Sequence, residues 1–268
     1  MKLVMILKIN WGVGLGLALL AAAAAGSERR FTYTYETAVL NPGDRELEPW
    51  STFRIGNAAG LVRLDQRIEF EVGLLPGLQT AWYLNFTGQT SGTGNMFSES
   101  FHFQGVSWET KYKLMDPVAD PVGLALYLEF GAGPAVQEVE GKVILDKRFG
   151  PVLAAFNLVA EHEWETEDTG VATEVELETD LAAAWIFDNG FSAGLELRTH
   201  TGIPVADGWE STAFFIGPAL SYASKGWWAS LSVLPQAFAI KAANEPPGLL
   251  DLAHNQAFNA RLIFGLHL

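Results

Sequence analysis

The sequence contains no cysteine, few basic residues and, beyond its first 25 residues, no long apolar run. Without cysteine the chain can form neither a disulfide nor a thiolate metal site, and it has no cysteine nucleophile. Its 17 Lys and Arg against 31 Asp and Glu give a net charge of −14. This excess of acid argues against nucleic acid as a partner, because phosphate binding needs clustered basic residues. After Gly26 no apolar stretch approaches the roughly 18 residues of a membrane-spanning helix, so a mature chain that enters a membrane must do so without helices.

The first 25 residues have the three parts of a secretory signal. Lys2 and Lys8 supply the positive start, residues 9–20 are almost wholly apolar, and residues 21–25 are all alanine. An apolar core of about 12 residues is short for a membrane anchor, which needs roughly 20. We therefore predict a cleaved signal peptide at residues 1–25 and a mature chain that begins near Gly26.

Residues 173–187 carry the clearest structural signal in the mature chain. Their odd positions are apolar or threonine, including Val175, Leu177 and Trp185, whereas their even positions run Glu174, Glu176, Glu178, Asp180 before two alanines. A strand sends alternate side chains to opposite faces, so this pattern places the apolar bulk on one side. A helix would scatter the acids around its circumference.

The same alternation recurs along the chain and predicts twelve strands. A length of 9–13 residues is close to what a tilted bilayer-crossing strand requires. Residues 31–40 also alternate, and we interpret them as a short periplasmic strand rather than a thirteenth barrel strand, because single-chain bacterial barrels have even strand numbers. The predicted domains are a periplasmic segment at 26–45 and a barrel at 46–268. The predicted strands are 46–56, 61–74, 78–90, 101–114, 122–131, 138–149, 151–163, 173–187, 190–202, 211–223, 226–240 and 254–268.

The connections provide a separate indication, because every second one is short and rich in turn residues. Four of the five predicted periplasmic turns are tight and contain Gly or Pro, among them Asn189-Gly190. The intervening connections are predicted to be longer outer loops, apart from the first, and they include residues 90–100, 132–137 and 164–172. Short turns on one side and longer loops on the other are typical of outer-membrane barrels.

The apolar face decides between a membrane barrel and a water-soluble β-protein. Twelve strands with a continuous Leu, Val, Phe, Ala and Trp face present more apolar surface than a soluble barrel of this size can bury. We therefore predict an all-β, closed antiparallel transmembrane barrel in the bacterial outer membrane, reached across the inner membrane through the signal peptide. The expected partners are outer-membrane lipid, a small solute and the barrel-assembly machinery. No oligomeric interface is readable.

The charged face of these strands should then line the lumen. Two interpretations of this lining remain open: interlocked salt bridges that plug the lumen, or an acidic surplus that leaves a narrow, cation-preferring path. The run from Glu174 to Asp180 is the best single candidate wall. The candidate lining residues are Glu69, Glu71, Glu109, Lys111, Glu174, Glu176, Glu178, Asp180, Glu196, Arg198 and Arg261.

No motif for catalysis is present, and we predict that the chain is not an enzyme and uses no cofactor. It contains no Gly-x-Ser-x-Gly, His-Glu-x-x-His or EF-hand pattern. Glu161-His162-Glu163 and His200 are weak candidates for a metal site near the outer rim. His162 falls on the outward parity and only His200 points inward, so polar rim residues explain these histidines equally well.

Three motifs in the first third of the mature chain carry a family resemblance. They are Tyr33-x-Tyr35-Glu36-Thr37, Glu46-Leu47-Glu48-x-Trp50, and the stretch from Leu64 to Gly73 that contains Arg67, Glu69 and Glu71. In these the chain resembles a group of uncharacterised proteobacterial outer-membrane barrels that is similar to transporters of the phenol-degradation MetA-pathway type. The resemblance implies a barrel that moves hydrophobic or aromatic small molecules, and it transfers no catalytic residue. The C-terminus departs from the usual pattern, because it ends in Leu268 rather than an aromatic residue.

The sequence thus predicts a porin-like channel or transporter for small solutes, either hydrophobic or cationic. The alternative is a barrel with a plugged lumen and a structural or partner-binding role. A third and weaker alternative is an enzyme with a site at the rim.

Overall fold

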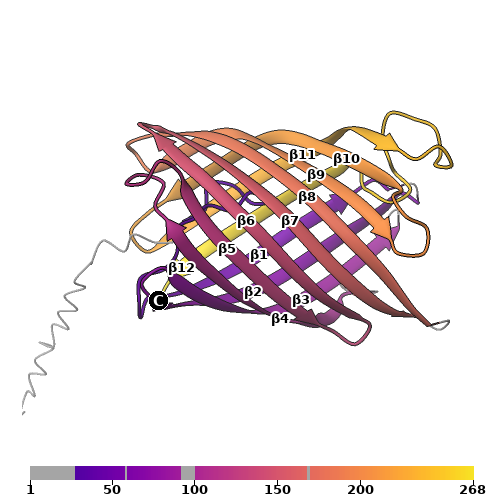
Figure 1. Cartoon of the computed structure of the whole chain (residues 1–268), viewed down its shortest axis with the longest axis horizontal. Helices are drawn as coiled ribbons and strands as arrows, with labels where there is room; N and C mark the ends of the chain where they lie inside the picture. Colours follow the sequence, from indigo (N-terminus) through magenta and orange to yellow (C-terminus); the bar gives the residue numbers. More distant parts are fainter. Residues whose placement is uncertain (1–27, 58, 92–99, 168–169) are drawn as a thin grey trace, which may run out of the picture.

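The computed structural model describes residues 28–57, 59–91, 100–167 and 170–268, and within them the chain forms a closed antiparallel barrel (Figure 1). The predicted signal peptide lies outside the described residues. The strands are β1 (Arg45–Ile55), β2 (Leu61–Leu75), β3 (Leu78–Ser91), β4 (His102–Met115), β5 (Gly123–Ala132), β6 (Val136–Phe149), β7 (Val152–Glu167), β8 (Gly170–Ile186), β9 (Phe191–Pro204), β10 (Ser211–Ala223), β11 (Trp227–Lys241) and β12 (Phe258–His267).

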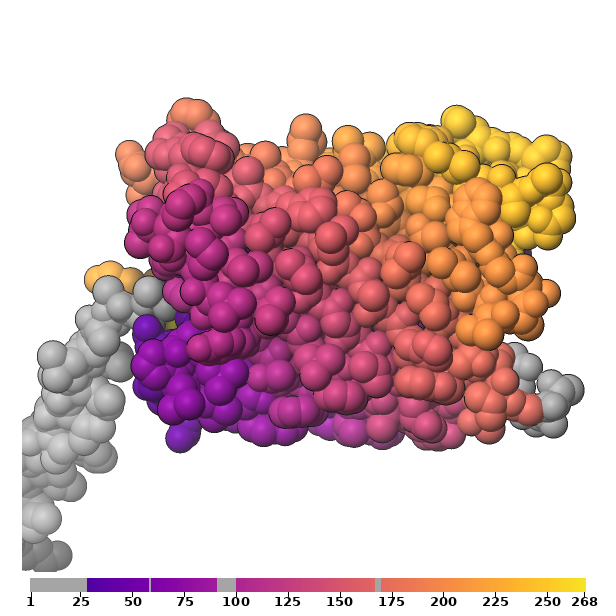
Figure 2. Space-filling model, in the orientation of Figure 1, coloured from indigo at the N-terminus to yellow at the C-terminus, as the bar shows by residue number. Residues whose placement is uncertain are grey.

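Each strand pairs with its neighbours in the chain, and β1 closes the ring by pairing with β12. The closing register joins Glu46 to His267 and Ile55 to Phe258. Closure leaves no unpaired strand edge, as a membrane barrel requires. The space-filling view in Figure 2 shows the continuous outer wall that results. The predicted twelve-stranded fold is therefore confirmed.

Alternation along the strands separates an apolar outer face from a polar inner face. On β8, Leu177, Leu181 and Trp185 are 42%, 47% and 50% exposed, whereas Asp180 between them is 2% exposed. The outward side chains are the kind that contact acyl chains, and the inward ones enclose the lumen. In the part of the chain that the structure describes, no helix is long and apolar enough to span a membrane.

The two ends of the barrel differ less in loop length than the sequence predicts. We call the end where β12 finishes the C-terminal end and the opposite end the distal end. The prediction of a distal loop at 164–172 is wrong, because β7 and β8 stay paired as far as Glu167 and Gly170. The distal connection between β5 and β6 is also short, at residues 133–135. Strands that project beyond the membrane need only backbone pairing, so the polar residues there continue the ladder instead of forming a loop.

The start of β12 also differs from the prediction, at Phe258 instead of residue 254. The carboxylate of Asp251 accepts hydrogen bonds from the backbone N–H groups of Ala253 and His254, at 3.2 and 3.3 Å. These local bonds hold the backbone in a turn and delay the strand.

Residues 29–40 lie inside the barrel and are neither a periplasmic strand nor a thirteenth barrel strand. We call them the lumen segment. They have no strand pairing, and Phe31, Tyr33, Tyr35 and Leu40 are at most 6% exposed. The predicted periplasmic segment at 26–45 is corrected for residues 29–40. The alternation that suggested a strand reflects side chains that pack against different parts of the inner wall.

Candidate functional site

The lumen segment is held by amide and carboxylate side chains of the inner wall. Asn157 of β7 acts as a backbone mimic: its Oδ1 accepts from the N–H of Tyr35 at 2.6 Å, and its Nδ2 donates to the Tyr35 carbonyl at 3.0 Å. Asp146 of β6 accepts from the Thr37 N–H at 3.0 Å and from its Oγ1 at 2.7 Å. These bonds replace the ladder that a strand would have made.

Glu196 of β9 accepts hydrogen bonds from three consecutive backbone N–H groups of the lumen segment. Its carboxylate accepts from the N–H groups of Thr32, Tyr33 and Thr34 at 3.4, 2.8 and 2.5 Å. Ser232 of β11 donates to the same carboxylate at 2.6 Å. Glu196 is fully buried, so these four donors supply the neutralising contacts that a buried carboxylate needs.

Basic side chains pack on the two tyrosine rings of the lumen segment. Arg261 lies 3.8 Å and Arg198 5.0 Å from the centroid of Tyr33. Lys142 lies 4.5 Å from the centroid of Tyr35. Cations over aromatic faces attract the ring quadrupole, most strongly where water is excluded. The segment therefore crosses the lumen with polar and cation–π contacts to strands on several sides.

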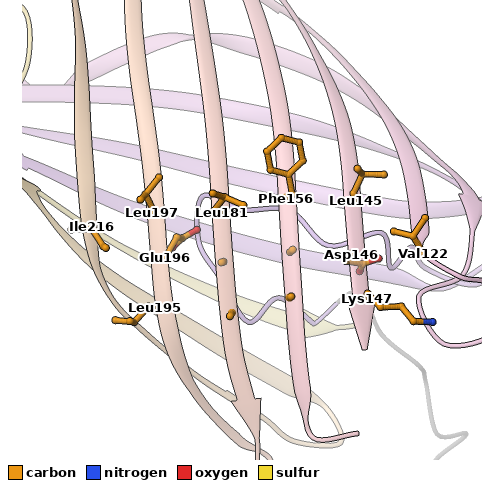
Figure 3. A pocket seen from close by; sticks show the side chains of 14 residues that line it. Val122, Leu145, Asp146, Lys147, Phe156, Leu181, Leu195, Glu196, Leu197 and Ile216 are labelled. Carbon is orange, nitrogen blue, oxygen red and sulfur yellow. The ribbon is translucent and has the colours of Figure 1, made fainter. Parts of the chain in front are cut away.

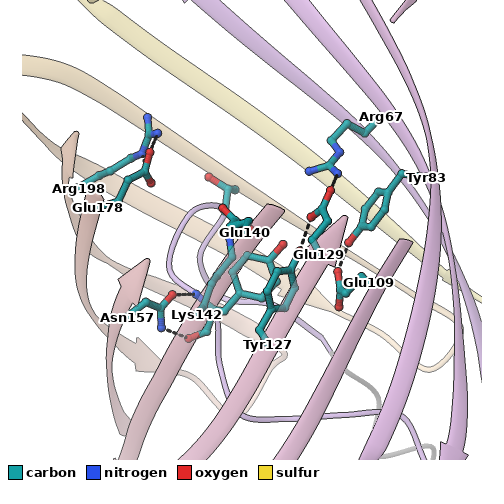
Figure 4. Close-up of polar contacts among 12 residues, drawn as sticks. Arg67, Tyr83, Glu109, Tyr127, Glu129, Glu140, Lys142, Asn157, Glu178 and Arg198 are labelled. Atoms are coloured by element: carbon teal, nitrogen blue, oxygen red, sulfur yellow. Dashed lines mark hydrogen bonds and ion pairs between the residues drawn. The ribbon is translucent and has the colours of Figure 1, made fainter. Parts of the chain in front are cut away.

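A second polar network joins the inner faces of β2 to β6 (Figure 4). Arg67 pairs with Glu129, which also accepts from the hydroxyl of Tyr127. The hydroxyl of Tyr83 donates to Glu109. Because Tyr83, Glu109 and Glu129 are at most 3% exposed, this network fills the lumen and does not border open water.

The distal half of the lumen is acidic on one side. Strands β6, β7 and β8 place partly exposed glutamates on their inner faces, which we call the acidic wall. β7 and β1 are six strands apart in either direction around the ring, so this wall faces the strands that carry Arg54 and Arg63. Within the wall, Glu178 accepts two hydrogen bonds from Arg198, one of 2.9 Å from Nε. The acidic wall consists of Glu138, Glu140, Glu161, Glu163, Glu174, Glu176 and Glu178.

The predicted lining residues lie on the inward parity, but they divide into two levels. Glu174, Glu176 and Glu178 are partly exposed in the distal half. The other eight lie deeper, and Arg198 and Arg261 among them pack on Tyr33. Seven of these eight deeper residues are at most 8% exposed: Glu69, Glu71, Glu109, Lys111, Asp180, Glu196 and Arg198.

The weak metal candidates are not brought together as the sequence suggested. His162 points outward and packs on Trp164, with ring centroids 4.3 Å apart, so it does not join Glu161 and Glu163. His200 lies 3.1 Å from Glu178 and 3.6 Å from Glu176. Glu161 and Glu163 instead approach Glu138.

Sequence reasoning placed Glu196 on the inner face without its role in holding the lumen segment, and it missed Asn157. Asn157 is the clearest case, because it is the one strongly polar inward residue between Val152 and Ala160. An isolated polar side chain on the inward parity of an otherwise apolar strand stretch was a usable signal. Its partner, the backbone of Tyr35, is 122 residues away and could not be identified from spacing.

A polar cluster links two distal loops outside the membrane-spanning strands. His254 contacts Glu210 through Nδ1 at 3.1 Å and Glu245 through Nε2 at 2.9 Å. Partial burial opposes protonation, but the hydrogen bond to Glu245 and the charge of Glu210 outweigh it and raise the pKa of His254. Burial likewise disfavours the charged Asp251, yet hydrogen bonds from Ser211 and Asn255 lower its pKa. Both pKa shifts favour the charged forms, in which these groups tie the loops together.

One surface hollow is on the lipid-facing wall and not in the lumen (Figure 3). It has a volume of about 470 Å³ and extends over β6 to β10. The short side chains of Ala154 and Ala183 form its floor between larger neighbours such as Phe156, Leu181 and Leu195. Its outward position makes it a feature of the membrane contact surface.

Comparison with solved structures places the fold among outer-membrane channels. The COG4313 outer membrane channel from Pseudomonas putida F1 matches with a TM-score of 0.62 and 12% identity, over 87% of this chain and 98% of that one. The NanC porin matches with a TM-score of 0.52 and 10% identity, over 83% and 99%. The KdgM porin in complex with disordered oligogalacturonate gives 0.51 and 10%, over 82% and 98%. At these identities the likeness is one of fold, which is the fold of bacterial outer-membrane proteins.

Among curated proteins no sequence matches the chain. A family model does match, over residues 23–266, which is nearly the whole chain. The protein belongs to a family of unknown function, DUF6662.

Proposed function

We propose that the protein is an outer-membrane channel for small solutes, with a lumen occluded by residues 29–40 and a distal half that prefers cations. The observation that carries this proposal is the acidic wall of β6 to β8, which faces Arg54 and Arg63 above the lumen segment. The fold likeness to outer-membrane channels supports a transport role. We further propose that the barrel-assembly machinery inserts the chain after secretion through its signal peptide.

In this proposal the lumen segment must move before a solute larger than a small ion can pass. It crosses the lumen, and its backbone is bonded to β6, β7 and β9. Its contacts are hydrogen bonds and cation–π pairs, each worth on the order of 1 kcal/mol net, so a partial detachment is energetically accessible. We propose a gated lumen instead of a permanently open one.

The acidic wall provides the selectivity in this proposal. A lining of one charge concentrates the opposite ion and repels like ions, as charged rings do in cation channels. Arg54 and Arg63 on the facing strands share Asp65, at 2.9 and 2.6 Å, which leaves these three groups with one net positive charge. The resulting transverse field orients a solute that carries both charges. Small cations and zwitterions are the class of solute that this distal lumen favours.

A disulfide lock tests the gate. Because the native chain has no cysteine, Thr37→Cys with Asp146→Cys introduces a single pair, at positions whose Oγ1 and Oδ1 atoms lie 2.7 Å apart. In planar bilayers the oxidised protein should show lower conductance than the same protein after reduction. Equal conductance in both states would contradict the gate, and no conductance in either state or in wild type would favour the plugged structural barrel.

A second candidate function, passage of small aromatic molecules, is favoured by the rings inside the lumen. Tyr35 and Tyr127 meet edge to face at 5.3 Å, and Trp50 and Tyr83 at 6.2 Å. These rings would offer stacking partners to an aromatic solute once the lumen segment moves. Liposome uptake of phenol compared with an alkylammonium ion of similar size distinguishes this role from cation passage.

A further inference from the structure

Two pairs of glutamates face each other directly on the inner face of the β1–β2 hairpin. Glu46 is opposite Glu71, and Glu48 is opposite Glu69. All four side chains are at most 5% exposed. Like charges in directly opposed positions destabilise a sheet, and burial of ionised carboxylates adds a desolvation cost. Such an arrangement requires something positive between the strands.

Three of these residues, Glu48, Glu69 and Glu71, form what we call the carboxylate cluster. One carboxylate oxygen of each lies within 4.8 Å of the others. Both oxygens of Glu69 and Oε1 of Glu48 are buried without a hydrogen-bond partner among the described residues. Oε2 of Glu48 accepts a hydrogen bond from Trp50 at 3.0 Å, and Oε1 of Glu71 accepts one from Gln79 at 3.0 Å. Unfilled acceptors therefore converge on a common point.

The nearby cations of the protein do not fill this point. Arg29 acts on Glu48 and Glu69 through its charge, but it stacks on Tyr35 at 3.9 Å and forms no ion pair with either carboxylate in the described structure. His267 pairs with Glu46 at 2.9 Å, outside the cluster. Arg67 is occupied by Glu129.

We propose that the carboxylate cluster of Glu48, Glu69 and Glu71 binds a divalent cation of the calcium type. The three carboxylates offer up to six oxygen ligands, and Ca²⁺ takes 6–8 oxygens at roughly 2.3–2.6 Å in flexible geometry. No nitrogen or sulfur donor belongs to the cluster, which disfavours Zn²⁺ and Cu²⁺. Protons shared between carboxylates are the alternative source of positive charge.

Two of the other carboxylate groupings have less need of a metal ion, because each already contains a positive partner. In the one formed by Glu176, Glu178 and His200, Arg198 already neutralises Glu178. In the loop grouping, His254 already bridges its two glutamates. The carboxylate cluster on β1 and β2 is also where two of the sequence motifs meet, those that contain Glu48-x-Trp50 and Glu69-x-Glu71.

Terbium luminescence provides a direct test, since Tb³⁺ occupies oxygen-ligated calcium sites. The indole of Trp50 is bonded to Glu48, so excitation of tryptophan should sensitise a bound Tb³⁺. Mature protein refolded in detergent with a chelator, then transferred to Tb³⁺, should give saturable emission that Ca²⁺ removes. Glu69→Gln and Glu48→Gln should each weaken Tb³⁺ binding by at least about tenfold. Glu165→Gln, at an exposed position of β7 outside these carboxylate groupings, is the control and should bind like wild type.

Thermal unfolding separates calcium from protons. Ca²⁺ should raise the Tm of wild type, because a ligand that binds only the folded state stabilises it. Without Ca²⁺, Glu69→Gln should have a higher Tm than wild type, since it relieves repulsion, and Ca²⁺ should no longer shift it. Emission that persists in both variants, or a wild-type Tm that Ca²⁺ does not change between pH 5 and 8, would overturn the proposal. Neither readout depends on conductance, so this site and the proposed channel can fail separately.

Discussion

At the scale of single residues, ion pairs inside the lumen contribute to the free energy of unfolding. Arg198 and Glu178 form a charge-assisted pair with restricted exposure, and the Arg198 ring contact to Tyr33 links it to the lumen segment. Arg198→Ala leaves Glu178 without its main partner and should lower the free energy of unfolding by about 3 kcal/mol. Urea unfolding in phospholipid vesicles, followed by tryptophan fluorescence, measures this loss. Arg148→Ala, which removes an exposed side chain bonded only to Gly150 O, should change stability by less than about 0.5 kcal/mol.

The loop histidine predicts a pH dependence with a definite sign. A raised pKa means that His254 stabilises the folded loops in its protonated form, so its contribution is complete at low pH and is lost as pH rises through its folded pKa. An NMR titration should find the midpoint of His254 above 6.5 in wild type. Glu245→Gln should lower that midpoint, because it removes the hydrogen bond that favours imidazolium. A midpoint unchanged by this substitution would contradict the attribution.

At the scale of elements, the lumen segment depends on a few bonds from distant strands. Asn157→Ala removes two hydrogen bonds, worth together about 2 kcal/mol, and should raise the detached population by more than about tenfold. Single-channel recording should then show more frequent or larger openings. Ser192→Ala, which changes an inward residue of β9 bonded to Ser221 instead of the lumen segment, is the control and should leave conductance unchanged.

The point where the lumen segment joins β1 is equally constrained. Gly73 accepts from Gly43 at 2.8 Å and donates to Asp44 at 3.0 Å, and a Cβ at position 73 would overlap the Asn41 carbonyl. Gly73→Ala should therefore displace the segment and increase its proteolysis in intact vesicles. Gly141→Ala has 4.0 Å of clearance to the nearest backbone oxygen and should behave like wild type. Equal proteolysis of the two variants would show that this contact does not hold the segment.

The strands were predictable from the sequence wherever apolar and polar residues alternate along them. On β8, alternation alone identified Leu177 as outward and Asp180 as inward, because lipid and lumen impose opposite requirements on neighbouring residues. The lumen segment was not predictable, since Tyr33 and Tyr35 alternate as a strand would while their backbone partners lie on β7 and β9. The carboxylate cluster depends on strand register, which the motif at Glu69 did not reveal by itself.

At the scale of the whole molecule, the charge distribution predicts ion preference. The acidic wall faces Arg54 and Arg63 across the distal lumen, and replacing Glu161, Glu174 and Glu176 by Gln removes three of its seven carboxylates. Reversal potentials in a KCl gradient should show cation preference in wild type and a smaller preference in the triple variant. Asp207→Asn, on the exposed turn after β9, is the control for charge at the same end. An unchanged reversal potential would exclude the wall as the selective element.

The separation of inner and outer faces over the whole barrel can be tested with its tryptophans. Trp185 is 50% exposed on the outer face, whereas Trp228 is 1% exposed and bonded to Glu46 inside. Lipids brominated on their acyl chains quench only nearby indoles, so in single-tryptophan variants with the others changed to Phe, Trp185 should be quenched strongly and Trp228 weakly. If the apolar face were instead the interior of a water-soluble barrel, Trp185 would be shielded and the mature chain would bind no vesicles. The two outcomes follow from the same alternation with opposite faces turned outward, so this pair of residues decides which face meets the lipid.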